Sequence, residues 1–236
     1  MRGLLTEGPF VKLVLFDCDG TLVDSQHVIV EAMRRAFTRA GLLVPPRADV
    51  LSIVGLSLVE AMRALGKDAP DFPAEALADL YRNAFHELRA EAGFVEPLFP
   101  GIKAALDRLS ARADVVLGIA TGKSQRGVAA VLRHHGLEGR FLTIQTADDA
   151  PSKPHPAMVL QAAAATGIAP EAAMLIGDTS FDMVMARAAG ARAIGVTWGY
   201  HPAEHLVEAG AERLVDHAED LLPAMEQLWS AMHEPI

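Results

Sequence analysis

Three aspartates lie close together near the start of the chain, in the stretch LFDCDGTLVDS at residues 15–25. Asp17 and Asp19 come directly after the apolar run VKLVLF, and Asp24 follows them. A carboxylate is costly to remove from water unless it is paired, hydrogen-bonded or bound to a metal. We therefore expect groups from elsewhere in the chain to compensate the charges of Asp17 and Asp19.

Polar residues also follow three later apolar runs, VVLGIA, FLTIQ and AMLIG, where strands would end. They are Thr121, Gly122 and Lys123 after the first run, Lys153 in ADDAPSKPHP after the second, and Asp178 and Asp182 after the third. Ligands of open α/β sheets bind at the carboxyl ends of the strands. The sequence therefore predicts a site at one edge of a sheet.

The residue types at this edge indicate phosphate chemistry with a metal ion. Asp17, Asp19 and Asp178 would raise one another's pKa values unless a cation were present. Carboxylates that leave room for phosphate oxygens suit Mg²⁺. The Thr121 hydroxyl and the backbone N–H of Gly122 could hold phosphate oxygens at a helix start. Lys153 would add a fixed positive charge.

Alternating strand and helix patterns must position these residues. Short apolar runs predict buried strands at residues 11–16, 115–120, 141–145, 173–177 and 193–197. Helical patterns lie between the later runs, at residues 101–109, 124–135, 156–166 and 181–189. This alternation predicts an α/β fold, a Rossmann-like doubly wound parallel sheet with crossover helices.

The first connection between strands is far longer than the others. It runs from Phe16 to Val115, although a crossover needs only about a dozen residues. It contains helical patterns at residues 26–40, 57–65 and 73–92 and no convincing strand. We expect an all-helical insert at residues 24–96 and a core of residues 1–23 and 97–236. Pro97 and Pro100 suit a hinge-like return.

Composition limits the class of protein. The 236 residues, 51% apolar and 22% charged, can form a globular core. Cys18 is the only cysteine, which excludes an internal disulfide and makes a cytoplasmic address the default. The leading residues, with Glu7 and Pro9, do not resemble a signal peptide, and no stretch approaches the roughly 18 apolar residues of a membrane span. We expect a soluble monomer or homodimer without membrane partners.

The charge balance makes nucleic acid an unfavourable partner. The formal charge is −9, from 21 basic and 30 acidic side chains, and no basic cluster interleaves with aromatic residues. Such a surface repels small anions at long range. A phosphate site would therefore need its own local positive charge.

Four motifs carry a family resemblance. DCDGTLVDS, the threonine of ATGKS, the lysine of SKPHP and the acids of GDTSFD resemble, in order and spacing, the motifs of the haloacid dehalogenase superfamily of phosphotransferases. The resemblance spans the chain, and the insert at residues 24–96 is similar to that superfamily's helical cap domain. The segment GVTWGYHP, around Trp198 and Tyr200, resembles the phosphoglycolate phosphatase-like branch.

The resemblance implies a role for each motif residue. Asp17 would attack phosphorus and form an aspartyl-phosphate, and Asp19 would be the general acid and base. Mg²⁺ would bind the carboxylates of Asp17 and Asp178 and the backbone carbonyl of Asp19. Thr121 and Lys153 would hold the transferring phosphoryl group.

Two further residues would support this site. Asp182 would orient bound water or Lys153 from outside the metal ligands. Gly20 would let the backbone approach the phosphate closely.

Substrate choice is expected from the insert. The stretch IVGLSLVEAM is our candidate for its pocket-facing part, with Gly55 allowing close approach, Leu56 flanking it, and Ser57 capping the next helix or touching substrate. These residues favour a small organic phosphate monoester, similar to phosphoglycolate. The alternatives are a sugar-phosphate mutase of the β-phosphoglucomutase type or an inorganic pyrophosphatase, and more remotely a non-catalytic phosphoacceptor or binding protein. Asp19 disfavours dehalogenation, because a leaving halide needs no general acid.

Other residues have structural interpretations. Asp24 and Ser25 are expected to cap the helix that follows them, and Cys18 is expected to face away from its neighbours and pack in the core. We expect Lys123 to be solvated at a helix start, with a position facing the phosphate pocket as the alternative, and a pocket position for His155 stays open. The remaining candidates are expected at the surface or at helix caps: His134, His135, His201 and His205.

Overall fold

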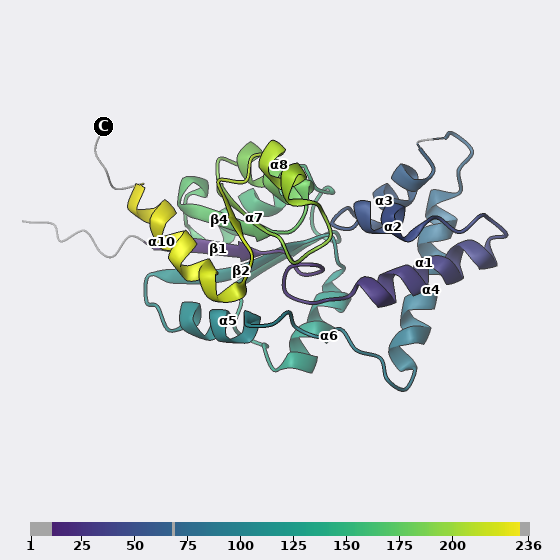
Figure 1. Cartoon of the computed structure of the whole chain (residues 1–236), viewed down its shortest axis with the longest axis horizontal. Coiled ribbons are helices and arrows are strands. Elements are labelled where there is room, and N and C mark those ends of the chain that lie inside the picture. The colour runs from purple at the N-terminus through teal and green to yellow at the C-terminus, as the bar shows by residue number, and fades with distance from the viewer. Residues whose placement is uncertain (1–10, 68, 232–236) are drawn as a thin grey trace, which may run out of the picture.

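The computed structural model describes residues 11–67 and 69–231 (Figure 1). The predictions for residues 1–10 and 232–236, including those for Glu7 and Pro9, lie outside the described residues. A six-stranded sheet forms the centre, in the order β3-β2-β1-β4-β5-β6, and every strand pair is parallel. The strands are β1 (Lys12–Phe16), β2 (Val115–Thr121), β3 (Thr143–Thr146), β4 (Ala173–Gly177), β5 (Arg192–Val196) and β6 (Arg213–Val215).

Alternating side chains of β1 supply two separate cores. Val14 and Phe16 pack with α5 (Ile102–Ser110), α6 (Gln125–His135) and α10 (Leu221–Ala231) on one face of the sheet. Leu13 and Leu15 pack with α7 (Ala157–Thr166), α8 (Ser180–Ala188) and α9 (Ala203–Glu208) on the other. Helices therefore cover both faces, as Figure 1 shows with α7 and α8 above the sheet and α5 below it. The predicted α/β fold is confirmed.

The order of the strands creates a switch point between β1 and β4. The chain runs from β1 outward through β2 to β3, and then crosses back to place β4 on the other side of β1. Phe16 pairs with Ile119 of β2 and with Ile176 of β4. The residues that follow β1, β2 and β4 consequently lie at one sheet edge, where such folds bind ligands.

Four helices lie between β1 and α5 and form the helical insert. They are α1 (Gln26–Arg39), α2 (Arg47–Ser52), α3 (Leu58–Leu65) and α4 (Ala74–Ala90). Ile29, Met33 and Phe37, four residues apart on α1, pack with Leu77 of α4 in a cluster of their own. The insert lies beyond the carboxyl edge of the sheet (Figure 1). Its predicted limits, residues 24 and 96, stay a prediction.

Several element boundaries differ from those expected. Helices agree within about two residues, but β3 begins at Thr143 rather than at residue 141. The sequence did not predict α2, α9, α10 or β6. The shortest of these cannot show a period, since α2 and α9 have six residues each and β6 has three. Two 3₁₀ turns complete the order, at Pro170–Ala172 and Ala218–Asp220.

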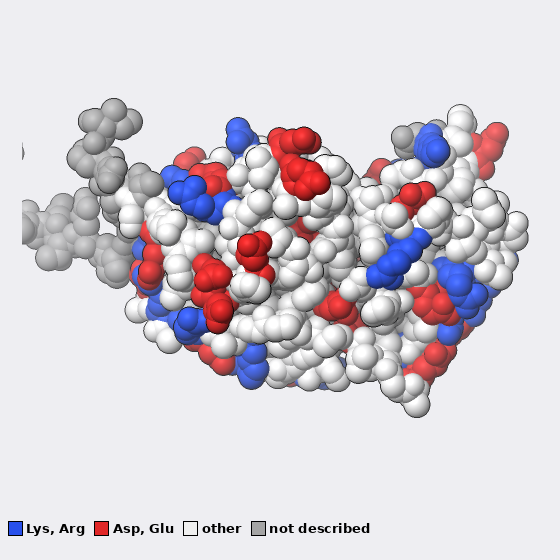
Figure 2. Space-filling model, in the orientation of Figure 1, with Lys and Arg blue, Asp and Glu red and all other residues white. Residues whose placement is uncertain are grey.

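Acidic and basic side chains are interspersed on the face of the molecule in Figure 2. On the insert, Arg35 pairs with Glu31 and Glu91, and Arg39 pairs with Glu87. Exposed pairs of this kind add little stability each. Within the described part of the chain, no helix is both long and apolar enough to cross a membrane.

Candidate active site

Asp17 lies buried at the end of β1, beside the switch point. Its Oδ1 is 2.8 Å from Nζ of Lys153, yet neither carboxylate oxygen receives a well-aligned hydrogen bond from the described residues. Burial is the largest influence on this group and raises its pKa to about 6, against the opposing effect of Lys153. The site therefore contains a carboxylate whose charge is only partly compensated.

Lys153 lies between two carboxylates. It comes from the loop after β3, its side chain is fully buried, and its Nζ donates to Oδ1 of Asp182 at 2.6 Å. Burial alone would lower the pKa of this lysine, but Asp17 and Asp182 together raise it above its usual value. Lys153 is thus a fixed positive charge inside the sheet edge, as expected.

Asp178 and Asp182 follow β4 and are both held by neighbouring donors. Asp178 accepts from the Thr21 hydroxyl at 3.0 Å and from the backbone N–H of Tyr200 at 2.8 Å. Asp182 accepts from the backbone N–H and the hydroxyl of Thr179 in a capping box at the start of α8. Burial raises the pKa of Asp178 well above its ordinary value.

These carboxylates fit a divalent cation. One oxygen from each of Asp17, Asp178 and Asp182 lies within 4.8 Å of the others. Lys153 is the one cation among them, so negative charge is in excess when all three carboxylates are ionised. The oxygens of Asp182 are already bonded to Lys153 and Thr179, whereas those of Asp17 lack aligned donors. Hard oxygen ligands with this excess charge suit Mg²⁺.

The structure gives a reason for the glycine at position 20 that the sequence did not indicate. Its φ is +87°, and a Cβ built there would collide with the carboxylate of Asp178. The missing side chain makes room for Asp178. The expectation that Gly20 lets the backbone approach a phosphate group closely stays a prediction.

The charge of Asp19 is compensated by Lys123. Its Oδ1 accepts from Nζ of Lys123 at 2.7 Å and from the hydroxyl of Ser25 at 2.5 Å. The Lys123 side chain is only 8% exposed and also donates to Glu96 at 3.1 Å. Burial alone would lower its pKa, but Asp19 and Glu96 raise it well above normal. The prediction of a solvated Lys123 is wrong, and the alternative that Lys123 faces the pocket holds, because Lys123 lines the cavity between the core and the insert.

Glu96 connects this second cluster to the helical insert. It lies in the segment that returns from the insert, and its carboxylate also accepts from Arg89 of α4 at 3.1 Å. Its backbone carbonyl accepts from Nε2 of His135 at 2.8 Å. This role was not predicted from the sequence, although the neighbouring Pro97 indicated a hinge-like segment.

Ser25 occupies the first cap position of α1, but its hydroxyl makes no capping bond there. It binds Asp19 instead, and its backbone N–H donates to the Tyr200 hydroxyl at 3.0 Å. Asp24 accepts from the Gln26 backbone N–H at 3.4 Å. The capping prediction is therefore wrong for Ser25, whereas Asp24, one position before the cap residue, bonds the first N–H of α1. Cys18 is buried against the core, as predicted.

The loop at residues 53–57 docks on the core. Gly122 allows this contact, because a Cβ there would come within 2.5 and 2.6 Å of the carbonyl oxygens of Gly55 and Leu56. Gly55 in turn faces the Thr179 side chain, with a φ of +102°. Ser57 donates its backbone N–H to Ser152 at 2.8 Å, and its hydroxyl makes no capping bond.

Two histidines differ in their placement. His201, expected at the surface or at a helix cap, is buried: its Nδ1 accepts from the backbone N–H of Ser180 at the start of α8, and its Nε2 donates to the carbonyl of Ser52 in the insert. His155 is exposed, and its Nδ1 accepts from the Ala157 backbone N–H at 3.2 Å. It therefore does not line the pocket.

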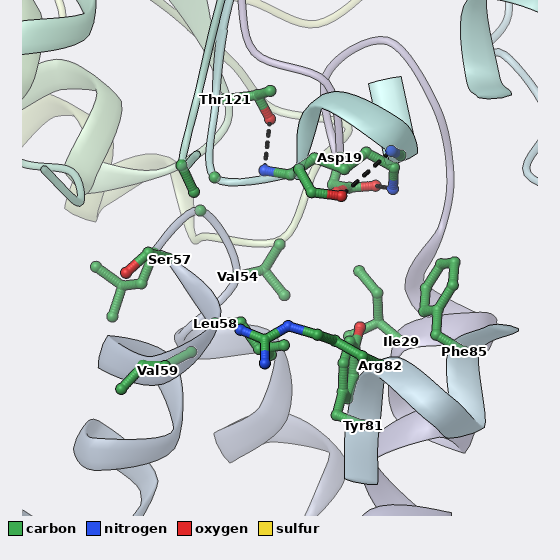
Figure 3. A pocket seen from close by; sticks show the side chains of 18 of the residues that line it. Asp19, Ile29, Val54, Ser57, Leu58, Val59, Tyr81, Arg82, Phe85 and Thr121 are labelled. Carbon is green, nitrogen blue, oxygen red and sulfur yellow. Dashed lines mark hydrogen bonds and ion pairs between the residues drawn. The ribbon is translucent and has the colours of Figure 1, made fainter. Parts of the chain in front are cut away.

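A cavity of about 560 Å³ lies between the core and the insert (Figure 3). Asp17, Asp19 and Thr121 line its core side, and the Thr121 hydroxyl accepts from the Lys123 backbone N–H at 3.2 Å. On the insert side, it is lined by Gly55, Leu56 and Ser57 and by residues of α4 that the sequence analysis missed: Tyr81, Arg82, Phe85, His86 and Arg89. The i, i+4 spacing of Tyr81 and Phe85 is the one signal that pointed to this face.

Comparisons with known proteins agree on a family. The family model described as haloacid dehalogenase-like hydrolase matches residues 14–196. A probable phosphatase, IndB, of Dickeya dadantii is 33% identical over 228 residues, which cover 95% of this chain and 97% of that protein. A phosphoglycolate phosphatase of Yersinia pestis is 32% identical over 219 residues, with 91% and 93% covered. The crystal structure of a predicted phosphatase from Clostridium acetobutylicum superposes with a TM-score of 0.81 at 26% identity, over 92% and 99% of the two chains.

Proposed function

The chain belongs to the haloacid dehalogenase-like hydrolases, and from this premise we propose that it hydrolyses a small organic phosphate monoester, similar to phosphoglycolate, through an aspartyl-phosphate intermediate. It is a phosphoric monoester hydrolase of the phosphoglycolate phosphatase-like branch. The observation that supports the intermediate is Asp17: a buried carboxylate without aligned donors, next to Lys153 and facing the cavity.

Mg²⁺ is the proposed cofactor. The carboxylates of Asp17 and Asp178 and the backbone carbonyl of Asp19 would hold it, while Asp182 keeps Lys153 in place. When bound, the ion supplies positive charge that offsets the phosphate oxygens. The excess of negative charge around Asp17 supports this assignment.

In the first proposed step, an oxygen of Asp17 attacks phosphorus. The bond between phosphorus and the ester oxygen breaks, and the leaving oxygen takes a proton from Asp19. Lys153 and the Thr121 hydroxyl hold the phosphoryl oxygens during the transfer. Asp17 and Asp19 both line the cavity, which supports their cooperation on one substrate.

In the second step, water releases the phosphate. Asp19, now ionised, takes a proton from water, which attacks phosphorus and breaks its bond to Asp17. Asp17 returns as a free carboxylate and Asp19 as a protonated acid, so the cycle is balanced.

A substrate panel tests this function. Release of phosphate is measured from phosphoglycolate, sugar phosphates, nucleotides and pyrophosphate, with and without Mg²⁺, and isomerisation of β-glucose 1-phosphate is measured beside it. We expect Mg²⁺-dependent release from a small monoester. Turnover that persists after chelation would contradict the metal assignment. Preferred hydrolysis of pyrophosphate, or isomerisation without release, would replace the function by one of the two alternatives.

A further inference from the structure

We propose that the substrate carries an apolar body beyond its phosphate group and a second anionic group at the far end, which Arg82 binds on the insert side of the cavity. This inference rests on the proposed function, because it places the phosphate group at Asp17. It goes beyond that function because it specifies the size and chemistry of the leaving group, the part of the substrate that is separated from the phosphate.

The cavity is larger than a two-carbon ester needs. Its volume of about 560 Å³ falls in the range of about 300–1,000 Å³ that is typical of pockets for drug-sized ligands. Phosphoglycolate contains only two carbon atoms, one that carries the phosphate ester and one in the carboxyl group. A longer molecule would fill the space between Asp17 and α4.

The insert side of the cavity is predominantly apolar. Ile29, Met33, Val54, Leu58 and Val59 line it. The hydroxyl groups of a sugar would lose their hydrogen bonds to water on this surface without regaining them. An apolar body instead gains from leaving water.

Positive charge gathers where the far end of such a molecule would lie. Arg82 and Arg89 come from one face of α4, and Arg126 comes from α6, where its guanidinium donates to Nδ1 of His86 at 3.2 Å. Among the residues that the structure describes, the carboxylates lining the cavity are Asp17, Asp19 and Asp148, all from the core. This cationic wall stands out in a chain whose formal charge is −9.

Arg82 is the cation of this wall that can most easily exchange its partner. Arg89 is bonded to Glu96, which is nearly fully buried. Arg82 pairs with Asp79, whose side chain is 73% exposed while that of Arg82 is 56% exposed. Such pairs are weak. Figure 3 shows the Arg82 guanidinium extending over the cavity, on the side opposite Asp19 and Thr121.

A homologous series of esters tests the proposal. The probes are ω-phosphooxy carboxylates, which begin with phosphoglycolate and lengthen by one methylene at a time, and alkyl phosphates of equal length without the carboxylate. We expect kcat/KM to rise on the order of threefold for each early methylene. The carboxylates should then pass through a maximum at the length that reaches Arg82, whereas the alkyl phosphates should show no such maximum.

Two variants separate recognition by Arg82 from general effects. Arg82→Met should reduce kcat/KM for the best carboxylate about tenfold more than for its alkyl match. Arg34→Met removes an arginine of similar exposure, 54%, which is likewise in an i, i+3 pair but lies outside the cavity lining. This variant should leave the ratio unchanged.

Different results would overturn different proposals. The inference is overturned if phosphoglycolate is the best carboxylate, or if Arg82→Met lowers both series equally. Hydrolysis of phosphoglycolate in that case would leave the proposed function standing. If no ester of either series is hydrolysed with Mg²⁺, the proposed function fails and the inference falls with it.

Discussion

Two lysines of this protein, Lys153 and Lys123, each lie between two carboxylates, but their surroundings carry different charge. Lys153 pairs with Asp17 and Asp182, and Asp178 lies close to both carboxylates, which gives three carboxylates to one ammonium group. We call this the first cluster. Lys123 and Arg89 face Asp19 and Glu96, which gives two charges of each sign. We call this the second cluster.

The difference indicates which cluster requires a cation. The second cluster is neutral when all its groups are ionised, and both carboxylates have donors. The first cluster has excess negative charge and a carboxylate without aligned donors. Burial and the neighbouring carboxylates raise the pKa values of Asp17 and Asp178. The first cluster is therefore the one that fits a divalent ion.

The clusters also differ in the parts of the molecule that they join. Every member of the first cluster follows a strand of the core. The second cluster takes Glu96 and Arg89 from the insert and its return segment, and it ends on Asp19 at the cavity. The first cluster thus fixes groups within a rigid sheet edge, whereas the second links the position of the insert to Asp19.

Removing Lys153 should lower the free energy of unfolding more than any other change considered below. Lys153→Met leaves Asp17 and Asp182 buried without their cation, so we expect unfolding in urea to show a loss of about 3–5 kcal/mol, together with loss of phosphatase activity. Lys153→Arg should recover part of the stability. A stability equal to that of the wild type would contradict the compensating role of Lys153.

Mg²⁺ should stabilise the protein through the first cluster alone. At a concentration one hundred times its dissociation constant, the ion should add about 2.7 kcal/mol to the free energy of unfolding. Asp178→Asn should lose this gain in a thermal unfolding assay, and Glu96→Gln, in the second cluster, should keep it. An equal gain in both variants would contradict the proposal that Asp178 binds the ion.

Removing Lys123 should lower the free energy of unfolding less than removing Lys153. Lys123→Met leaves Glu96 with Arg89 and Asp19 with Ser25, so we expect a loss of about 1–3 kcal/mol on urea unfolding. Because Asp19 loses a donor, kcat should also fall about tenfold or more. If Lys123→Met unfolds as easily as Lys153→Met, the contrast between the clusters is wrong.

Removing a lysine outside both clusters should have the smallest effect on the free energy of unfolding. Lys12 bonds Asp114 at 2.7 Å near the start of β1, where Arg112 and Lys12 hold the pKa of Asp114 below its usual range. Lys12→Met leaves Asp114 bonded to Arg112 and should therefore lower stability at neutral pH by about 1 kcal/mol. A depressed pKa stabilises above the ordinary value for aspartate, and this gain is lost as pH falls toward the folded pKa. The difference between Lys12→Met and wild type should shrink in acid; one that grows would contradict this sign.

The sequence predicted the first cluster well and the second poorly, for a physical reason. Buried parallel strands are continuous apolar runs, and the residues that follow them must meet at one edge. Asp17, Lys153, Asp178 and Asp182 are therefore brought together by topology alone. Lys123 follows a strand too, but its burial depends on Glu96, which only the packing of the insert brings near.

Side-chain direction and local packing account for the remaining differences. Gly20 is bare because Asp178 fills the space beside it, and the Ser25 hydroxyl turns toward Asp19 instead of capping α1. Neither direction follows from residue type. The cavity depends likewise on how α4 faces the core, and this explains why Tyr81, Arg82 and Phe85 were missed.

The central claim is that Asp17 carries the phosphoryl group, and Asp17→Asn tests it most directly. The substitution removes charge from a cluster with excess negative charge, so the variant should fold at least as stably as the wild type. Its phosphate release with Mg²⁺ should fall by a factor on the order of 10³ or more, whereas Asp24→Asn, in the same stretch, should keep most of the activity. A folded Asp17→Asn variant with substantial turnover would contradict the account.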